Sequence, residues 1–209
     1  EYIDTGPIVW INGTFIEENF NTTRLPSLNH TGFELAYWTW DSTTFEGTFA
    51  FWNTTAVLDG TYYIEVSITD LAGKKGFGTV HFTVDTLSPV VDIAYPTDGQ
   101  YLNTSTIWIN GTLTELNVGS LEPHINNTAF SLVYWDQLTG AFAFKNNTFL
   151  SDGTIYLTVN FTDLAGKTGS DMVYFILDTT LPIVSIEHPM EGAYLNVSFI
   201  WVNGTVTEL

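Results

Sequence analysis

Eleven Asn-x-Ser/Thr triplets, the acceptor motif for N-linked glycosylation, are the residues of this chain with the clearest chemistry. With 15 Asn and 43 Ser or Thr among 209 residues, chance placement would give about 3 such triplets as the baseline for this motif. Composition therefore does not explain the excess, which predicts dense N-glycosylation on an extracytoplasmic surface where each modified asparagine points to solvent. The predicted acceptors are Asn12, Asn21, Asn29, Asn53, Asn103, Asn110, Asn126, Asn146, Asn160, Asn196 and Asn203.

Most of these triplets recur in register, because the chain is a tandem repeat. Trp-x-Asn-Gly-Thr occurs around Asn12, Asn110 and Asn203, and the last two copies are 203 − 110 = 93 residues apart. The same period separates LDGTYYIEVSITDLAGK from SDGTIYLTVNFTDLAGK, which begin at Leu58 and Ser151. The first two copies are 98 residues apart, and we expect most of the five extra residues in 39–46. Duplication explains the register of the triplets but not their density within one unit.

Alternating apolar and polar residues predict strands over 62–69 and 79–84, and again over 155–162 and 172–177. Gly73 and Gly166 suit the positive-φ position of the turn between each pair. No stretch keeps a helical period. About seven short strands in each unit predict an all-β fold of tandem two-sheet sandwiches.

Three motifs follow one another in each unit: Asp-Gly-Thr-x-Tyr, Thr-Asp-Leu-Ala-Gly-Lys, and Val-Asp-Thr-x-x-Pro-x-Val-x-Ile, with Leu for the first Val in the second unit. This series resembles the tandem immunoglobulin-like domains of bacterial and archaeal surface proteins, which commonly have D-G-x-Y, D-x-A-G-N and V-D-T-T-A-P. The resemblance covers two units and part of a third, and implies immunoglobulin-like β-sandwiches. It departs from the usual pattern at four positions, where Lys74 and Lys167 replace Asn, and Ser88 and Leu181 replace Ala. In such sandwiches Tyr63 and Tyr156 would be tyrosine-corner residues, or else ordinary strand aromatics.

The repeat phase predicts three segments: a first repeat over 1–86, a second over 87–179 and an incomplete third over 180–209. Residues 1–18 and 192–209 have the same phase, so the first unit lacks the opening strand that Pro89–Pro96 and Pro182–Pro189 supply later. We expect end-to-end association with neighbouring copies or further repeats, either in one continuous array or by addition of a strand led by Ile183–His188.

Tryptophan positions give two further expectations. We interpret Trp10, Trp38, Trp108 and Trp201 as core residues, and we take Trp135 as the counterpart of Trp38. Trp40 and Trp52 are the candidate surface aromatics, able to pack against the first sugars of a glycan or against a partner.

Composition excludes several classes of function. Five Lys and Arg against 23 Asp and Glu give a net charge of −18, which is incompatible with a phosphate-binding surface, so no nucleic acid partner is expected. No apolar run could enter a membrane, and the absence of Cys excludes disulfides and thiolate metal sites. The four histidines have no metal-ligand spacing, and no motif predicts catalytic residues.

Calcium is the one cofactor that we weigh, because related surface repeats sometimes bind it between units. Asp70, Asp85, Asp163 and Asp178 lie at the strand ends concerned. Ca²⁺ takes six to eight oxygen ligands, whereas each turn offers one aspartate with Lys74 or Lys167 nearby. We therefore expect no metal and no other cofactor.

These observations together predict a structural, non-enzymatic segment of an extracellular, cell-surface protein or filament that carries covalent N-glycans. The density of acceptor motifs without Cys favours an archaeal host. Two alternatives stay open: an adhesin or carbohydrate-binding module that uses Trp40 and Trp52, and an accessory region of a large secreted hydrolase.

Overall fold

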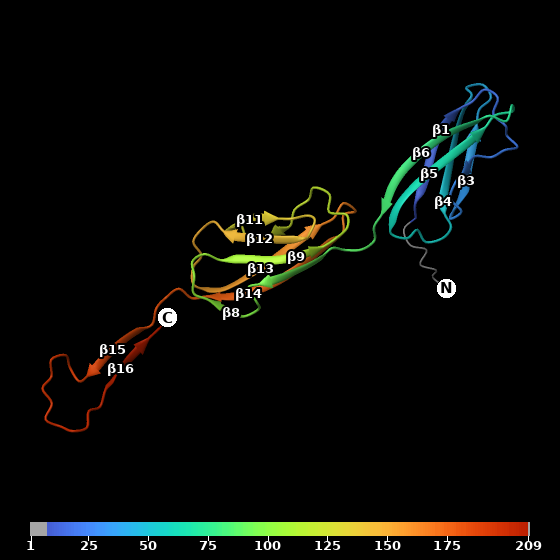
Figure 1. Cartoon of the computed structure of the whole chain (residues 1–209). Coiled ribbons are helices and arrows are strands. Elements are labelled where there is room, and N and C mark those ends of the chain that lie inside the picture. The colour runs from blue at the N-terminus through green and yellow to red at the C-terminus, as the bar shows by residue number, and fades with distance from the viewer. Residues whose placement is uncertain (1–7, 209) are drawn as a thin grey trace. The chain divides into compact units, whose positions relative to one another are not determined.

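The computed structural model describes residues 8–208, so residues 1–7 of the predicted first repeat and residue 209 lie outside the described range. The fold is all-β, as the sequence predicts, and consists of tandem immunoglobulin-like sandwiches (Figure 1). Among the described residues there is no helix long and apolar enough to cross a membrane. The chain divides into two compact units, Glu1–Thr86 and Leu87–Leu209.

The first unit packs two three-stranded sheets, with strand orders β1-β4-β3 and β2-β5-β6. Antiparallel pairing places Trp10 opposite Trp52 and Ile11 opposite Phe51, and this register puts Ile11 and Phe51 in the core. The strands are β1 Trp10–Ile16, β2 Ser27–Leu28, β3 Phe33–Trp40, β4 Glu46–Asn53, β5 Gly60–Thr69 and β6 Lys75–Val84.

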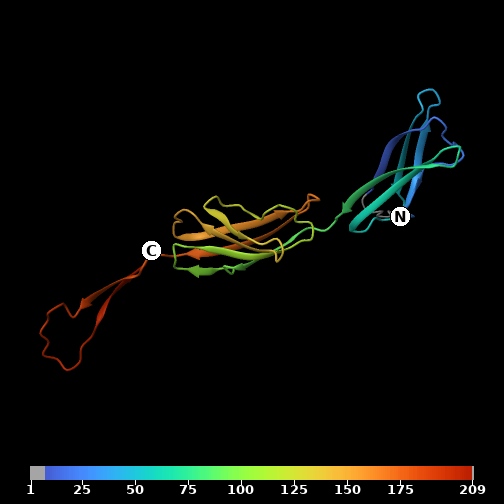
Figure 2. The same cartoon turned by 45° about the horizontal axis from the view of Figure 1, so that its top comes forward.

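The second unit contains two four-stranded sheets, with strand orders β11-β12-β9-β7 and β10-β13-β14-β8, and its two layers are visible in Figure 2. A separate two-stranded sheet, β15 with β16, follows it, and the described residues of this hairpin region are almost all exposed. The strands are β7 Val90–Tyr95, β8 Gln100–Leu102, β9 Trp108–Thr114, β10 His124–Ile125, β11 Phe130–Trp135, β12 Ala141–Asn146, β13 Gly153–Thr162, β14 Thr168–Leu177, β15 Ile183–His188 and β16 Asn203–Thr207.

Period-two alternation builds both cores, because successive side chains of a strand point to opposite faces of its sheet. In β13, Leu157, Val159 and Phe161 are fully buried while the residues between them face outward. The predicted strands are confirmed and are longer than the pattern showed, since each extends to its turn. Gly73 and Gly166 have the expected positive φ, at 82° and 83°.

The extra residues of the first unit do not lie in the loop after β3, as the sequence led us to expect. Asp41 and Asp136 begin hairpin loops of the same design, in which the aspartate carbonyl accepts a hydrogen bond from the N–H four residues later, at 2.8 Å in both units. The strands themselves differ, because β3 and β4 have eight residues each and β11 and β12 have six. Trp40, not Trp38, is therefore the counterpart of Trp135, and both donate an indole N–H to a backbone carbonyl.

A carboxylate clasp explains why Asp-Gly-Thr and Asp-Thr recur together in each unit. The Asp59 carboxylate accepts hydrogen bonds from the backbone N–H and hydroxyl of Thr86, at 2.9 and 3.0 Å. Asp152 does the same with Thr179 and also accepts from the hydroxyl of Thr180. The hydroxyls of Thr179 and Thr180, followed by the Thr179 N–H, hold the pKa of Asp152 below its usual range. The clasp therefore ties the start of β13 to the chain that leaves β14.

Because the folded-state pKa of Asp152 is lowered, its contribution to stability is present above the unfolded pKa and is lost as pH falls through the folded value. We expect Asp152→Asn to lower the melting temperature of the second unit at neutral pH. The difference from the natural protein should shrink as pH falls below about 4, the ordinary range of Asp titration, and should disappear only below the lowered folded-state pKa. Thermal melts at several pH values test this, with the exposed Glu122→Gln as control; a deficit that persists at acidic pH would contradict it.

Candidate functional site

The glycine of each later Asn-Gly-Thr triplet lies where two backbones approach closely. A Cβ on Gly111 would clash with the carbonyl of Asp92 on β7, and a Cβ on Gly204 would clash with the carbonyl of Ser185 on β15. Only glycine permits this approach, so its place in the triplet is required by strand pairing. The fold thus accounts for the middle residue of the motif and leaves the flanking Asn and Thr to be explained.

The asparagine of the triplet points the other way, because it precedes the inward glycine by one residue. Asn12, Asn110 and Asn203 are exposed on β1, β9 and the start of β16. Four other predicted acceptors are exposed as well, and three are partly exposed. The exposed ones are Asn29, Asn103, Asn126 and Asn196, and the partly exposed ones are Asn21, Asn146 and Asn160.

One predicted acceptor contradicts the expectation that every such asparagine faces solvent. Asn53 is only 6% exposed, because it has the same phase on β4 as the core residue Phe51. Its Oδ1 accepts the backbone N–H of Val9 at 2.7 Å, and its Nδ2 donates to the carbonyl of Thr55 at 3.1 Å. The equivalent Asn146 makes the same bonds, with its Nδ2 donating to Ser105 and Thr148. These two amides bind backbone of their own unit through the atom that would carry a sugar.

The outer face of the first sheet carries a pair of stacked tryptophans. Trp10 and Trp52 are paired across β1 and β4, with ring centroids 6.1 Å apart and exposed fractions of 54% and 41%. In the second unit Trp108 occupies the position of Trp10, and the Lys145 ammonium lies 5.5 Å from its ring centroid. Asn12 shares this face, since it follows Trp10 by two residues.

Several aromatic assignments from the sequence are wrong. Trp10, Trp108 and Trp201 are exposed and not core residues, whereas Trp52 is exposed as expected. Trp38 is partly buried and its ring contacts the buried Phe20 edge-on, with centroids 5.4 Å apart. Trp40 is half-buried, and its indole N–H donates to the carbonyl of Glu17 at 2.9 Å. Trp40 also pairs with Gly47, at the far end of the β3–β4 pair from Trp52, so these two do not form one patch.

The tyrosine-corner assignment also changes. Tyr63 and Tyr156 are exposed and contact their cross-strand neighbours His81 and Tyr174. The neighbouring Tyr62 instead donates its hydroxyl to the carbonyl of Leu58, four residues upstream, at 2.8 Å. This is the bond that defines a tyrosine corner.

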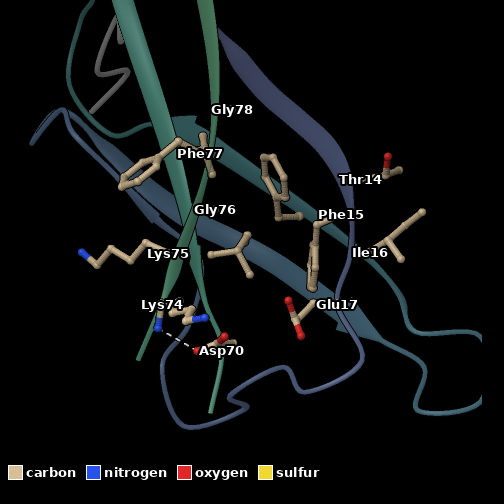
Figure 3. Close-up of a pocket in the computed structure, with 13 residues that line it drawn as sticks. Thr14, Phe15, Ile16, Glu17, Asp70, Lys74, Lys75, Gly76, Phe77 and Gly78 are labelled. Carbon is tan, nitrogen blue, oxygen red and sulfur yellow. Dashed lines mark hydrogen bonds between the residues drawn. The ribbon is translucent and has the colours of Figure 1, made fainter. Parts of the chain in front are cut away.

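A cavity of about 480 Å³ opens in the first unit between the end of β1 and the start of β6. Its lining includes Thr14–Glu17 from one side and Asp70 with Lys74–Gly78 from the other, which Figure 3 labels, together with Phe49, Val66 and Ile68. These apolar lining residues show that the core of this sandwich is incompletely covered at this edge. No sequence motif pointed to the cavity, because its two walls are some 60 residues apart in the chain (75 − 15 = 60).

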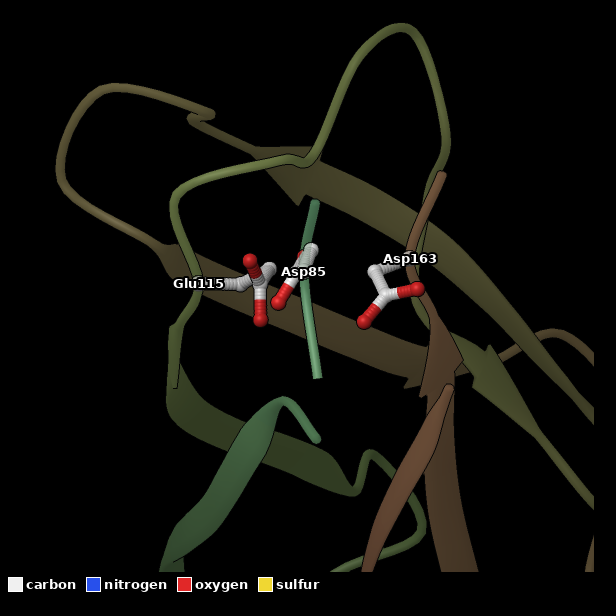
Figure 4. A group of neighbouring side chains, drawn as sticks. All are labelled: Asp85, Glu115 and Asp163. Atoms are coloured by element: carbon white, nitrogen blue, oxygen red, sulfur yellow. The ribbon is translucent and has the colours of Figure 1, made fainter. Parts of the chain in front are cut away.

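The carboxylates weighed for calcium lie at strand ends, as predicted. Asp70 and Asp163 each accept the backbone N–H of the turn lysine, at 2.7 and 2.8 Å, while Asp85 and Asp178 follow β6 and β14 and are half-buried. In the second unit Asp163 and Glu115 have carboxylate oxygens within 4.8 Å of each other. Figure 4 shows both side chains, and Asp85, which it also labels, belongs to the first unit.

Asp163 is the more unusual member of this pair. Its side chain is 3% exposed, and its Oδ2 is the one buried side-chain oxygen or nitrogen of residues 8–208 that has no hydrogen-bond partner. Glu115 already accepts the N–H groups of Leu116 and Asn117 through Oε1. No sequence motif pointed to Glu115, because its proximity to Asp163 arises only in the folded sandwich, where the ends of β9 and β13 meet.

The four histidines lie on separate elements. His30, His81, His124 and His188 are beside β2, in β6, in β10 and at the end of β15, and all four are exposed. Their positions leave them as surface residues of strands and turns.

Searches of protein-family models and of curated proteins found no match. Similar solved structures include a protocadherin gammaB7 fragment with domains EC3–6, at 11% identity over 73% of this chain and 42% of that chain, with a TM-score of 0.39. Fibronectin(III)-like modules of Clostridium thermocellum CbhA match at 15% identity, 63% and 67% coverage and a TM-score of 0.33. The titin Ig tandem A164–A165 matches at 11% identity, 83% and 89% coverage and a TM-score of 0.31. The chain spans less than half of the protocadherin fragment.

Two carboxylates with half of their oxygens already bonded fall short of the six to eight ligands that Ca²⁺ takes. We therefore expect the second unit to melt at the same temperature in calcium and in chelator. Asp163→Asn should leave that temperature unchanged or raise it, because it keeps the Oδ1 acceptor for Lys167 and removes a buried charge beside Glu115.

The matched control is Asp70→Asn, which changes the equivalent turn of the first unit. A bound ion present at 100 times its dissociation constant would add about 2.7 kcal/mol, enough to shift melting by several degrees. A drop in chelator that Asp163→Asn abolishes and Asp70→Asn leaves intact would show that the carboxylate pair holds a cation.

Proposed function

We propose that this chain is a structural repeat segment of an N-glycosylated extracellular surface protein or filament, and that it associates end to end with neighbouring copies or further repeats. In this proposal its role is mechanical and protective, without catalysis, cofactor or nucleic acid partner. The proposal places it at the cell surface, and the density of acceptor motifs favours an archaeal host.

The observation that carries the proposal is the outward position of the recurring acceptors in both sandwiches. Asn12 and Asn110 lie on the solvent face of equivalent strands, and Asn29 and Asn126 follow equivalent short strands at exposed positions. Hydrogen bonds to backbone give the buried Asn53 a role in folding, and Asn29 and Asn126 also accept backbone N–H groups, from Glu65 and Thr158. Within residues 8–208, the exposed side chains of Asn12 and Asn110 make no such hydrogen bond. Glycan attachment would explain why an exposed asparagine occupies this position in both units, as Asn12 and Asn110.

The stacked tryptophans support a glycan beside them. A sugar on Asn12 starts on the same face as Trp10 and Trp52, and aromatic rings offer the flat apolar surface that packs against a pyranose. Asn53 is next to Trp52 in the sequence but its side chain is buried, so Asn12 is the acceptor that shares the outer face with Trp52.

A second candidate function, binding of an external carbohydrate as an adhesin or as an accessory module of a secreted hydrolase, is favoured by the exposure of the same tryptophan pair. It uses Trp10 and Trp52 rather than the pair Trp40 and Trp52. A glycan array probed with glycan-free protein separates the candidates, because only the adhesin binds a sugar that it does not carry.

Glycopeptide mass spectrometry of the protein from its native host tests the primary proposal. We expect sugar on Asn12, Asn110 and Asn103, whose side chains are exposed, and bare amides at Asn53 and Asn146, whose Nδ2 groups are bonded to backbone. Bare Asn12 and Asn110 would contradict the surface-coat function. Sugar at Asn53 would show instead that attachment precedes the folding of β4.

The Trp52→Lys variant tests the contact between glycan and tryptophans, because it reproduces the Trp108–Lys145 pair that the second unit already has. Without glycan, we expect the stability of the first unit to change by less than about 0.5 kcal/mol, as for most surface substitutions. With glycan, the loss of stability should be larger, because the sugar can no longer pack on the Trp52 ring. Urea unfolding of both forms measures this, and an equal change in the two would exclude the contact.

A further inference from the structure

The predicted acceptors Asn12 and Asn110 lie in cross-strand rows that have the same three residue types. In the first unit, Asn12 of β1 pairs with Ala50 of β4, and Ala50 pairs on its other side with Tyr37 of β3. These three residues share the outer face of the sheet, because the neighbouring residues Ile11 and Phe51 face the core. The second unit repeats the row across β9, β12 and β11 with Asn110, Ala143 and Tyr134.

A β-bulge turns the tyrosine of each row outward. Leu35 and Leu132 pack against the two cores, and a regular strand would place the residue two positions later on the same inward face. The pairing instead shifts between Leu35 and Tyr37, and between Leu132 and Tyr134. Bulges re-aim side chains in this way, and the two tyrosines are 52% and 53% exposed. Both units therefore present an aromatic ring on the face of the acceptor by the same departure from regular pairing.

The row is the same in both units although the positions around it differ. In the neighbouring row, Trp52 and Glu34 of the first unit correspond to Lys145 and Ser131 of the second. On the other side, β3 and β4 are each two residues longer than β11 and β12 (8 − 6 = 2). Duplication alone would leave the row no more alike than its surroundings. A shared role for the asparagine, alanine and tyrosine explains why these three are unchanged.

The alanine between them brings the acceptor and the ring within reach of one glycan. The outer strands of the row are two strand spacings apart, about 10 Å, which the first two sugars of a glycan can span. Ala50 is 1% exposed although it points outward, so larger side chains enclose its methyl group. Within residues 8–208, the side chains of Tyr37 and Tyr134 make no hydrogen bond and no ring contact. Packing inside the described chain therefore does not explain why the bulge exposes these rings.

We propose that the first sugars of the glycans on Asn12 and Asn110 lie across the alanine of the row and pack against its tyrosine. Each sandwich then has its own glycan platform, formed by Ala50 with Tyr37 in the first unit and by Ala143 with Tyr134 in the second. A tyrosine ring offers an apolar face to the C–H groups of a pyranose, while its hydroxyl and those of the sugar stay in water. The glycan is thereby held along the sheet and covers its exposed aromatic surface.

Covalent attachment makes the chain's own glycan a better occupant than a free carbohydrate. A short tether gives an effective concentration in the millimolar range, so a contact too weak to hold a free sugar is enough. The acceptor at one end of each row supplies this tether. The inference deepens the proposed function and rests on it, since it requires that Asn12 and Asn110 are glycosylated.

A double-mutant cycle in the second unit tests the platform. Tyr134→Ser removes the ring, and Asn110→Gln removes the glycan from an exposed side chain that makes no hydrogen bond within residues 8–208. In the glycosylated full chain, we expect Tyr134→Ser to raise the unfolding equilibrium constant of the second unit about fivefold more than it does beside Asn110→Gln, as other aromatic contacts do. Urea unfolding of the four proteins measures this.

Val133→Ser is the matched control. Val133 precedes Tyr134 in the bulge, is 50% exposed and lies outside the row, so its replacement should have the same effect with and without the glycan. Equal coupling of Val133 and Tyr134 to the glycan, or no coupling of Tyr134, would overturn the platform.

Nuclear magnetic resonance of the glycosylated chain gives a second readout. We expect the ring current of Tyr134 to shift protons of the first sugars on Asn110 upfield, and Tyr134→Ser to return them to the positions of a free glycan. Sugar protons already at the free positions in the natural protein would overturn the contact. So would binding of a free oligosaccharide to the glycan-free chain that Tyr134→Ser abolishes, because the ring would then serve an external ligand.

The failure of this inference is distinguishable from the failure of the proposed function. Bare Asn12 and Asn110 in the protein from its native host would overturn both. A glycosylated Asn110 whose sugars do not respond to Tyr134→Ser would overturn the platform alone and leave the glycan coat in place.

Discussion

The close approach of the opening strand β7 to the glycine of Asn-Gly-Thr is the constraint on which the second sandwich depends. Where the carbonyl of Asp92 lies against Gly111, the sheet gains an edge strand and the core of the second sandwich is closed over Val91 and Leu113. No side chain larger than hydrogen fits at that position, so replacing the glycine of the triplet would disrupt the pairing of β7 with β9. In the first unit the equivalent Gly13 is crowded by a side chain instead, since a Cβ there would lie 2.7 Å from the ring of Phe49.

This constraint also fixes which residues can face solvent, because strand phase alternates strictly. Once Gly111 points inward, Asn110 and Trp108 must point outward together. The same rule places Asn53 inward with Phe51, although its triplet is as good an acceptor in sequence as that of Asn12. An acceptor motif therefore says where a sugar could be attached to an unfolded chain, and the phase of its strand decides whether the folded protein leaves the amide free.

Local rules predicted most of the fold, and phase explains the errors. Strands, turn glycines and the repeat period depend on nearby residues, and these predictions are confirmed. The core assignments of Trp10 and Trp108 are wrong because they followed hydrophobicity and not strand phase: each precedes an outward asparagine of the same strand by two residues and so shares its face. Trp201 lies before β16, where neither face of the hairpin is covered. Glu115 with Asp163, and the cavity beside Gly76, are outside the reach of such rules, because they arise where segments far apart in sequence meet.

The net charge of the chain opposes side-by-side association of its copies. At a net charge of −18, with few cations to pair, two copies that approach side by side meet like charges over a broad surface. An exposed strand edge is a risk of disordered aggregation. A strong net charge of one sign opposes that risk, because copies that collide repel one another before their backbones can pair.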